Sequence, residues 1–172
     1  MAERPLPNWD VAEIRRRLGL VANFATVAEA DYGHPRVRGR LTPEGAEKEL
    51  VSDWLPWVTA RAQNDRTWHP PEVGEQVFVV APYGDLNQGC VLGAVFAQDA
   101  KARQAPADRP TVDRTEYADG TVEEYDRDAN HWLLDMTASG GTMEIKTGST
   151  QVLIKPDSIA LRADRIDEND DR

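Results

Sequence analysis

The chain has 172 residues, of which 40% are hydrophobic and 7% aromatic, and its formal net charge at pH 7 is −10. This length suits one domain, or one compact domain with an extension, and the apolar fraction supports only a small core. The acidic balance argues against non-specific nucleic-acid binding, which requires basic surface to replace phosphate counterions. A single cysteine, Cys90, excludes an intrachain disulfide and a zinc site built from thiolates.

Residues 1–19 predict an N-terminal helical segment. Its helix begins near the polar residues of NWD and ends at Gly19, and apolar residues spaced by three and four share one face: Val11, Ile14 and Leu18. The N-terminus lacks the apolar core of a secretion signal, and no stretch approaches the roughly 20 apolar residues of a membrane helix. We therefore expect a soluble protein, without a signal peptide, that is made in a cytoplasm.

Residues 20–98 predict a small barrel of the OB type. Five strand-like runs follow one another in this segment: LVANFATVAEAD, the run around Val37, LVSDWLPWVTARA, EQVFVVAP and CVLGAVFA. Five short strands at this spacing are typical of a closed or partly open Greek-key barrel. The polar segment 99–110, rich in alanine and proline, predicts a linker.

Residues 111–172 predict a series of short β-strands. Asp119-Gly120 between two alternating runs indicates a type I′ hairpin. From Gly141 the chain divides into blocks of eight, GTMEIKTG, STQVLIKP, DSIALRAD and RIDENDDR, and each of the first three holds one strand. Alternation places one set of apolar residues on one face of these strands: Met143, Ile145, Val152, Ile154, Ile159 and Leu161.

A ribbon of two or three short strands is marginal in water. These six residues can form a core only if several chains pool them, because each buried apolar side chain contributes only about 1.5–3 kcal/mol. The pattern therefore predicts a homotrimer in which each chain supplies one third of a β-prism. The predicted fold class is mainly β: a short helix and an OB barrel, followed by the β-prism.

Candidate catalytic and metal-binding residues are sparse. His34, His69 and His131 lie far apart in the sequence, and no metal-ligand spacing joins them. Cys90 lies inside a strand-like run, which favours a small buried residue over a reactive thiolate. Neighbouring acidic pairs such as Glu123 and Glu124 point to opposite faces of a strand. We therefore predict no catalytic site, no metal site and no cofactor, and expect no enzyme.

Three tryptophans lie within fifteen residues of the predicted barrel: Trp54, Trp57 and Trp68. Arginines, including Arg66, interleave with them. Exposed aromatic and arginine side chains on an OB barrel can bind single-stranded nucleic acid. The same residues can also form the barrel core, or anchor a protein interface, where tryptophan and arginine are enriched. With the acidic charge balance, core or interface roles are favoured.

The stretch DWLPWVTARAQNDRTWHPPEVGEQVFVVAPYGDLNQGCVLGAVF, residues 53–96, resembles the baseplate assembly protein V family. These proteins are the central tail spikes of contractile-tailed phages and R-type pyocins. The elements W-L-x-W, R-T-W, P-x-x-G-E-Q-V and G-D-L carry the resemblance, and YADGTVEEY resembles the family segment that follows the barrel. The resemblance covers residues 8–125 well, and it extends to the later blocks of eight only in their architecture.

The resemblance implies a homotrimer in a virion or tailocin baseplate, with the OB barrel as a collar below the tail hub protein and beside the baseplate wedge proteins. It also implies a C-terminal triple-stranded β-helix (β-prism) that forms a spike, leads puncture of the target outer membrane and is assembled in the host bacterial cytoplasm. From the acidic charge we expect no nucleic-acid partner. The family's iron-binding H-x-H apex is absent here, so its metal residues do not transfer. A separate tip-capping protein, or an acidic tail folded over the end, would then close the spike. The alternatives are a nucleic-acid-binding OB module with an oligomerising tail, and an envelope-degrading enzyme on a spike.

Overall fold

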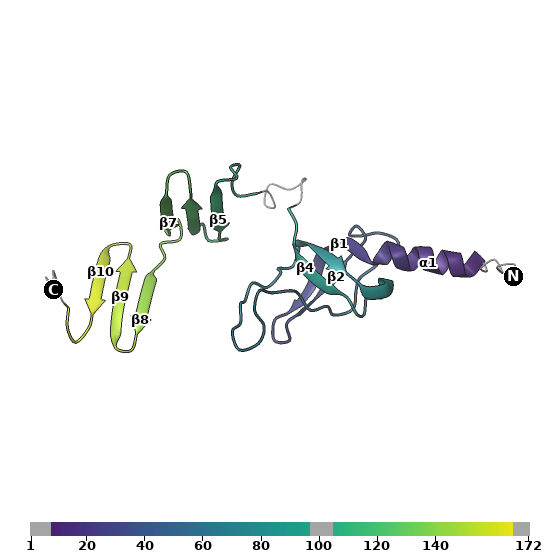
Figure 1. Cartoon of the computed structure of the whole chain (residues 1–172), viewed down its shortest axis with the longest axis horizontal. Coiled ribbons are helices and arrows are strands. Elements are labelled where there is room, and N and C mark those ends of the chain that lie inside the picture. Colours follow the sequence, from purple (N-terminus) through teal and green to yellow (C-terminus); the bar gives the residue numbers. More distant parts are fainter. Residues whose placement is uncertain (1–7, 97–104, 167–172) are drawn as a thin grey trace, which may run out of the picture. The chain divides into compact units, whose positions relative to one another are not determined.

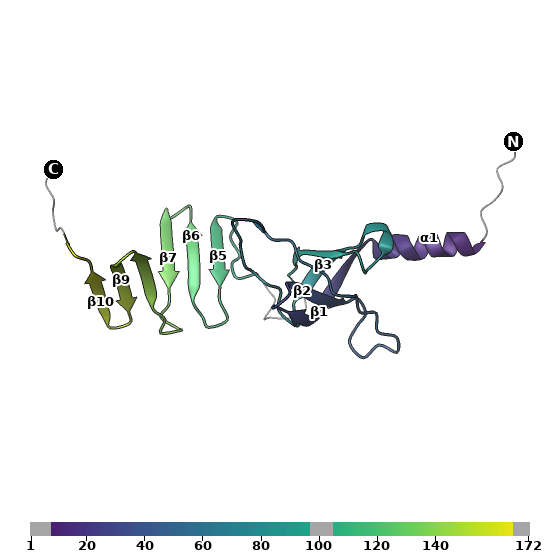
Figure 2. The ribbon, with the colours of Figure 1, turned by 90° about the horizontal axis from the view of Figure 1, so that it is seen from below.

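The computed structural model describes residues 8–96 and 105–166 (Figures 1 and 2). The chain divides into two compact units, Met1–Gln104 and Ala105–Arg172. Half of the predicted linker, residues 99–104, and the acidic end, residues 167–172, lie outside the described residues. The described chain is mainly β, with one short α-helix.

The first unit joins one helix to a four-stranded antiparallel sheet. The order of strands in the sheet is β2-β1-β3-β4, and a short 3₁₀ turn, η1, follows β3. The elements are α1 (Asn8–Leu20), β1 (Ala22–Asp31), β2 (Arg36–Arg40), β3 (Gln76–Val80), η1 (Pro82–Gly84) and β4 (Cys90–Ala94). The predicted helix is confirmed, and so are four of the five predicted strands.

The core of this unit is small and consists mostly of valine. Alternation along the strands sends every second residue to the same side, and β-branched side chains pack well on such a pleated surface. One cluster results, in which every member is at most 4% exposed: Ala25, Val27, Val37, Leu55, Val77, Val79 and Val91. Leu55 is the only member that comes from outside the sheet strands.

The prediction of a strand in LVSDWLPWVTARA is wrong, and the described residues form no closed barrel. This segment makes isolated bridges instead, from Val51 and Leu55 to β2 and from Trp57 to β4. Pro56 lies where the segment crosses from one edge of the sheet to the other, and proline has no N–H for a ladder. The Pro56 carbonyl still accepts a hydrogen bond from the Val91 N–H at 2.9 Å.

The second unit consists of two three-stranded antiparallel sheets. The first has the order β5-β6-β7 and the second has the order β10-β9-β8. The strands are β5 (Val112–Glu116), β6 (Val122–Asp126), β7 (His131–Asp135), β8 (Met143–Thr147), β9 (Thr150–Lys155) and β10 (Ser158–Arg162). The blocks of eight therefore contain the predicted strands, and two-residue turns connect β8 to β9 and β9 to β10.

The predicted hairpin between β5 and β6 is confirmed, but the prediction that its turn is of type I′ is wrong. A type I′ turn requires positive φ at both central residues, and of the Asp119-Gly120 pair only Gly120, at φ 85°, has it. The Gly120 N–H donates to the Tyr117 carbonyl, and the Tyr117 N–H donates to the Thr121 carbonyl, both at 2.9 Å. The loop is a wider turn that ends on a left-handed glycine, as in a G1 bulge.

Candidate functional site

The most distinctive surface of the second unit is one face of the sheet β10-β9-β8. The strand register aligns Met143, Ile154 and Ile159 in one row across the sheet, and aligns Ile145, Val152 and Leu161 in the next. We call these six residues the apolar face. Ile159 remains 71% exposed in the single chain, and Ile145 and Leu161 each remain 54% exposed.

The opposite face of the same sheet is mostly polar, although it also includes Leu153 and Ala160. Its residues include Glu144, Lys146, Gln151, Lys155 and Arg162. Glu144 pairs with Lys146 at 2.9 Å, and the same carboxylate contacts the Gln151 amide. The hydrogen bond from Lys146 lowers the pKa of Glu144. One face of the ribbon therefore suits water and the other does not.

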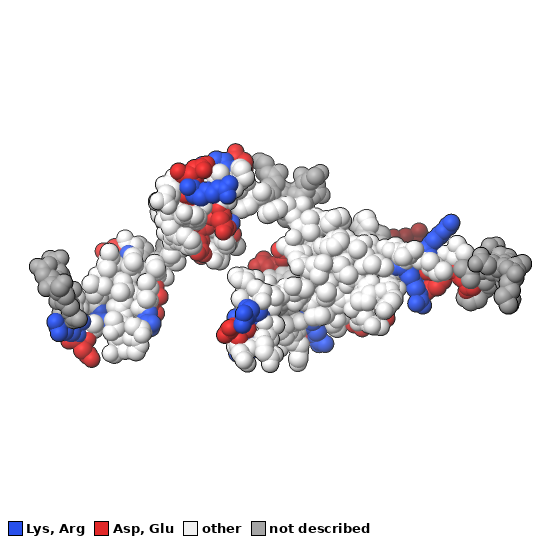
Figure 3. All heavy atoms as spheres, viewed as in Figure 1, with Lys and Arg blue, Asp and Glu red and all other residues white. Residues whose placement is uncertain are grey.

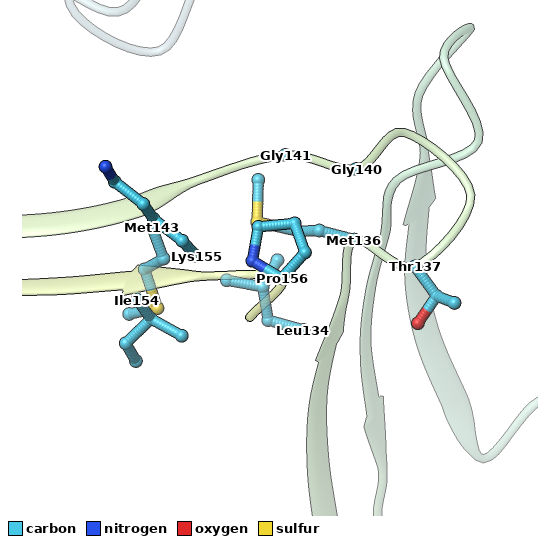
Figure 4. A pocket seen from close by; sticks show the side chains of 9 residues that line it. All are labelled: Leu134, Met136, Thr137, Gly140, Gly141, Met143, Ile154, Lys155 and Pro156. Carbon is cyan, nitrogen blue, oxygen red and sulfur yellow. The ribbon is translucent and has the colours of Figure 1, made fainter. Parts of the chain in front are cut away.

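A cavity of about 360 Å³ extends the apolar face toward β7. Figure 4 shows Met143 and Ile154 next to each other on β8 and β9, and Leu134, Met136 and Pro156 around the same space. The lining is completed by Thr137, Gly140, Gly141 and Lys155. The turn after β7 thus leaves an apolar hollow between the two sheets of this unit.

One face of the sheet β5-β6-β7 carries an ionic network. Arg114 on β5 pairs with Glu124 on β6 at 2.8 Å and with Glu116 at 3.4 Å. Its Nε has no hydrogen-bond partner among the described residues. Figure 3 shows acidic and basic side chains gathered over this sheet, whereas the visible surface over β8–β10 is mostly uncharged.

Asp126, at the end of β6, is 8% exposed and pairs with an arginine of the segment before β5. Its carboxylate accepts hydrogen bonds from the Asp128 and Ala129 N–H groups, and Arg109 lies 3.0 Å away. The bond from Ala129, followed by those from Asp128 and Arg109, lowers the pKa of Asp126. The predicted turn at DRDAN therefore uses its aspartate for backbone hydrogen bonding.

The opposite face of β5-β6-β7 is more aromatic. Tyr125 and Trp132 are register partners with ring centroids 6.0 Å apart, and Trp132 is 64% exposed. Glu123 lies on this face beside Leu134, whereas Glu124 lies on the ionic face. The two neighbouring carboxylates therefore belong to different sites, as the alternation predicts.

The tryptophans of the first unit form two groups. Trp57 packs against the valine core and makes a T-shaped contact with Trp68, with ring centroids 5.4 Å apart. Trp68 remains 53% exposed. Trp54 lies instead beneath the Arg36 guanidinium, whose Cζ is 4.8 Å from the centroid of the Trp54 ring. Arg66 is exposed and belongs to the loop before Trp68.

The arginines near Trp54 are already paired with carboxylates. Arg36 lies 3.0 Å from Asp31, and Arg38 lies 2.8 Å from Glu29. A single-stranded nucleic-acid platform needs cationic groups free to meet phosphate. This surface therefore offers a poor match to a polyanion, in agreement with the net charge.

The outer face of the four-stranded sheet is a surface that the sequence analysis did not identify. Phe24 on β1 and Phe78 on β3 are register partners with ring centroids 5.4 Å apart. Phe24 is 57% exposed, and Leu92 on β4 is 46% exposed. The sequence signal was the position of both phenylalanines in runs whose alternate residues are also apolar, so each strand has two apolar sides.

The histidines and the cysteine that were considered as metal ligands or catalytic groups do not form a common site. His34, His69 and His131 are all exposed, and His34 Nδ1 lies 3.2 Å from the Asp31 carboxylate. Cys90 is a partly buried free thiol on β4. Within residues 8–96 and 105–166, no group of three or more His, Cys, Asp or Glu side chains could hold a metal ion. No helix in the described part of the chain is long and apolar enough to span a membrane.

Comparison with known proteins identifies the family to which the first unit is similar. Residues 24–96 match the family model described as the Type VI secretion system/phage-baseplate injector OB domain. The chain is also 31% identical, over 140 residues, to the spike protein of Escherichia phage P2. The chain belongs to the phage baseplate V and spike family. That alignment covers 81% of the chain but only 58% of the P2 protein.

Two signature elements of this baseplate family have local structural roles here. In P-x-x-G-E-Q-V, the Gly74 N–H donates to the Val27 carbonyl and the Val27 N–H donates to the Glu75 carbonyl, both at 2.9 Å. In G-D-L, a Cβ on Gly84 would lie 2.1 Å from the Arg17 carbonyl oxygen. The first element therefore fixes the turn before β3, and the second lets α1 approach η1.

Proposed function

We propose that this chain is the central spike of a contractile-tail baseplate and acts as a homotrimer. The observation that carries the proposal is the apolar face, none of whose six residues is fully buried among the described residues of one chain. Four of them are at least 38% exposed in the single chain: Ile145, Ile154, Ile159 and Leu161. Three copies that turn these faces inward would form a triple-stranded β-helix and shield them from water.

The two units suit different tasks in this proposal. The injector OB domain would form a collar that docks below the tail hub and meets the wedge proteins. Exposed aromatic side chains such as Trp68 and Phe24 are the kind of residue that anchors protein interfaces. The β-sheet unit would form the shaft that leads the tail through the outer membrane of the target cell.

The proposed role is mechanical and needs no catalysis by this chain. Contraction of the sheath supplies the work, and the spike supplies a stiff body with a soluble surface. The ionic face of β5–β7 and the polar face of β8–β10 fit such a surface. A nucleic-acid-binding role has less support, because Arg36 and Arg38 face carboxylates of their own chain.

The first test of the proposal is the mass of the purified full chain at micromolar concentration, measured by light scattering. We expect a trimer without any other tail protein, and a monomer would contradict the proposal. Ile154→Asp should abolish assembly, because it would bring three carboxylates together in an apolar interior. Particles that carry this variant should lack a spike in electron micrographs and should fail to kill target cells.

A further inference from the structure

The helix α1 has an apolar stripe that no residue of 8–96 or 105–166 in its own chain covers. Figures 1 and 2 show α1 extending away from the four-stranded sheet of its unit. Its C-terminal end is anchored, since α1 contacts η1 and β1 and the Asn23 side chain donates to the Gly19 carbonyl at 3.0 Å. Toward the other end, Val11 is 36% exposed and Ile14 is 47% exposed.

A helix of this length gains much of its stability from packing of its apolar face. Isolated helices shorter than about 12–15 residues are marginal in water, and packing of an apolar face normally stabilises them. α1 has 13 residues. Its stripe, whose third member Leu18 is 67% exposed, remains open in the described structure of one chain.

The spacing of the stripe is that of a coiled-coil seam. Val11, Ile14 and Leu18 are separated by three and then four residues, which places them at positions a, d and a of a heptad. A β-branched isoleucine at d favours assemblies of more than two helices. The stripe is therefore suited to the matching stripe of other copies of this chain.

The charges beside the stripe agree with a parallel arrangement. Asp10 takes position g and Arg15 takes position e of the next heptad, and these two positions meet across neighbouring parallel helices. The other charges of α1 are satisfied within the helix, because Glu13 binds Arg16 at 2.8 Å and Arg17 at 2.7 Å. Within residues 8–96, by contrast, no ion pair joins Asp10 or Arg15 to a group of the same chain.

We propose that the α1 helices of three copies pack as a short parallel coiled coil, with Val11, Ile14 and Leu18 in the seam and Asp10–Arg15 pairs between chains. This inference rests on the trimer of the proposed function, whose cyclic symmetry makes equivalent helices parallel along the axis. A seam of three residues is too short to assemble dilute chains. Chains already joined elsewhere present their helices to one another at millimolar effective concentration.

The test uses the full chain with Cys90→Ser and one new cysteine. Ile14→Cys places a thiol in the seam, and Arg16→Cys places one on the outer side of the same helix as a matched control. Under brief oxidation, Ile14→Cys should give interchain disulfides at a rate independent of protein concentration. At 1 µM that rate should exceed chance collision by about a thousandfold, and Arg16→Cys should not show it.

The charge pair gives a second readout in the Ile14→Cys background. At low salt, Asp10→Arg should slow the cross-linking, and adding Arg15→Asp should restore it. Equal rates for all three proteins would contradict the parallel register. Circular dichroism checks that each variant is folded.

Light scattering on the same samples separates this inference from the proposed function. A trimer that forms no Ile14→Cys cross-link would overturn the coiled coil and leave the spike trimer standing. A monomer would overturn the trimer and the coiled coil together. A trimer with rapid, concentration-independent cross-linking supports both.

Discussion

Ile159→Ala is the sharpest test of the apolar face, because this residue contributes little to the single chain. Ile159 lies on β10 and is 71% exposed before assembly. Complete burial of such a side chain is worth about 1.5–3 kcal/mol, so burial of the exposed part in a trimer contributes about 1–2 kcal/mol per chain. Three copies contribute about 3–6 kcal/mol. At 1.4 kcal/mol per tenfold change, the dissociation constant for trimer assembly should rise by about 10²–10⁴.

The measurement is the dissociation of the trimer on dilution, by mass photometry or sedimentation, repeated in guanidinium chloride if the parent is too stable. Leu153→Ala is the matched control, because Leu153 lies on the opposite face of the same sheet. We expect the control to assemble almost like the parent. If Ile159→Ala and Leu153→Ala shift assembly equally, the apolar face is not the contact between chains and the reasoning is refuted.

Three further variants test other features of the structure. Gly84→Ala should lower the free energy of unfolding by more than the roughly 1–2 kcal/mol of left-handed backbone strain, because its methyl group would also meet the Arg17 carbonyl and loosen α1. Gly45→Ala is the control in urea unfolding: Gly45 has φ +76° and open space around it, so this variant shows the strain alone. Asp126→Asn should reduce the change in melting temperature between pH 3 and pH 6. The lowered pKa of Asp126 stabilises the fold at pH values above the usual aspartate pKa near 4, and this stabilisation is lost as the pH falls through the pKa of the folded state. Trp68→Ala should leave the domain folded yet reduce incorporation into tails, and normal incorporation would remove this tryptophan from the proposed interface.

Local patterns of the sequence predicted the β-sheet unit well. The strands β8, β9 and β10 can be recognised in the sequence because apolar residues alternate within each block and turn residues separate the blocks. Gly148 lies in one of these turns with φ 55°, and Pro156-Asp157 form the next. Both the position of each strand and the residues that share its face follow from this periodicity.

Contacts between distant segments were not predictable in the same way. Trp57 and Trp68 are neighbours because an irregular loop returns to the sheet, and no local pattern encodes that return. The run around Pro56 has the hydrophobicity of a strand, but the proline prevents a ladder and the segment crosses between two edges instead. The close approach of Gly84 to Arg17 depends on where α1 ends relative to η1, which periodicity does not determine.

The strict alternation of faces in β8, β9 and β10 has a consequence for how such a chain can change its length. Inserting one residue into a strand inverts every side chain beyond it, so charged groups move inward and apolar groups outward. Inserting a whole strand with its turn preserves the order of faces and lengthens the sheet by about 4.8 Å. Length variants in this unit should therefore differ by complete strand-and-turn blocks, and single-residue insertions should be tolerated only in the turns.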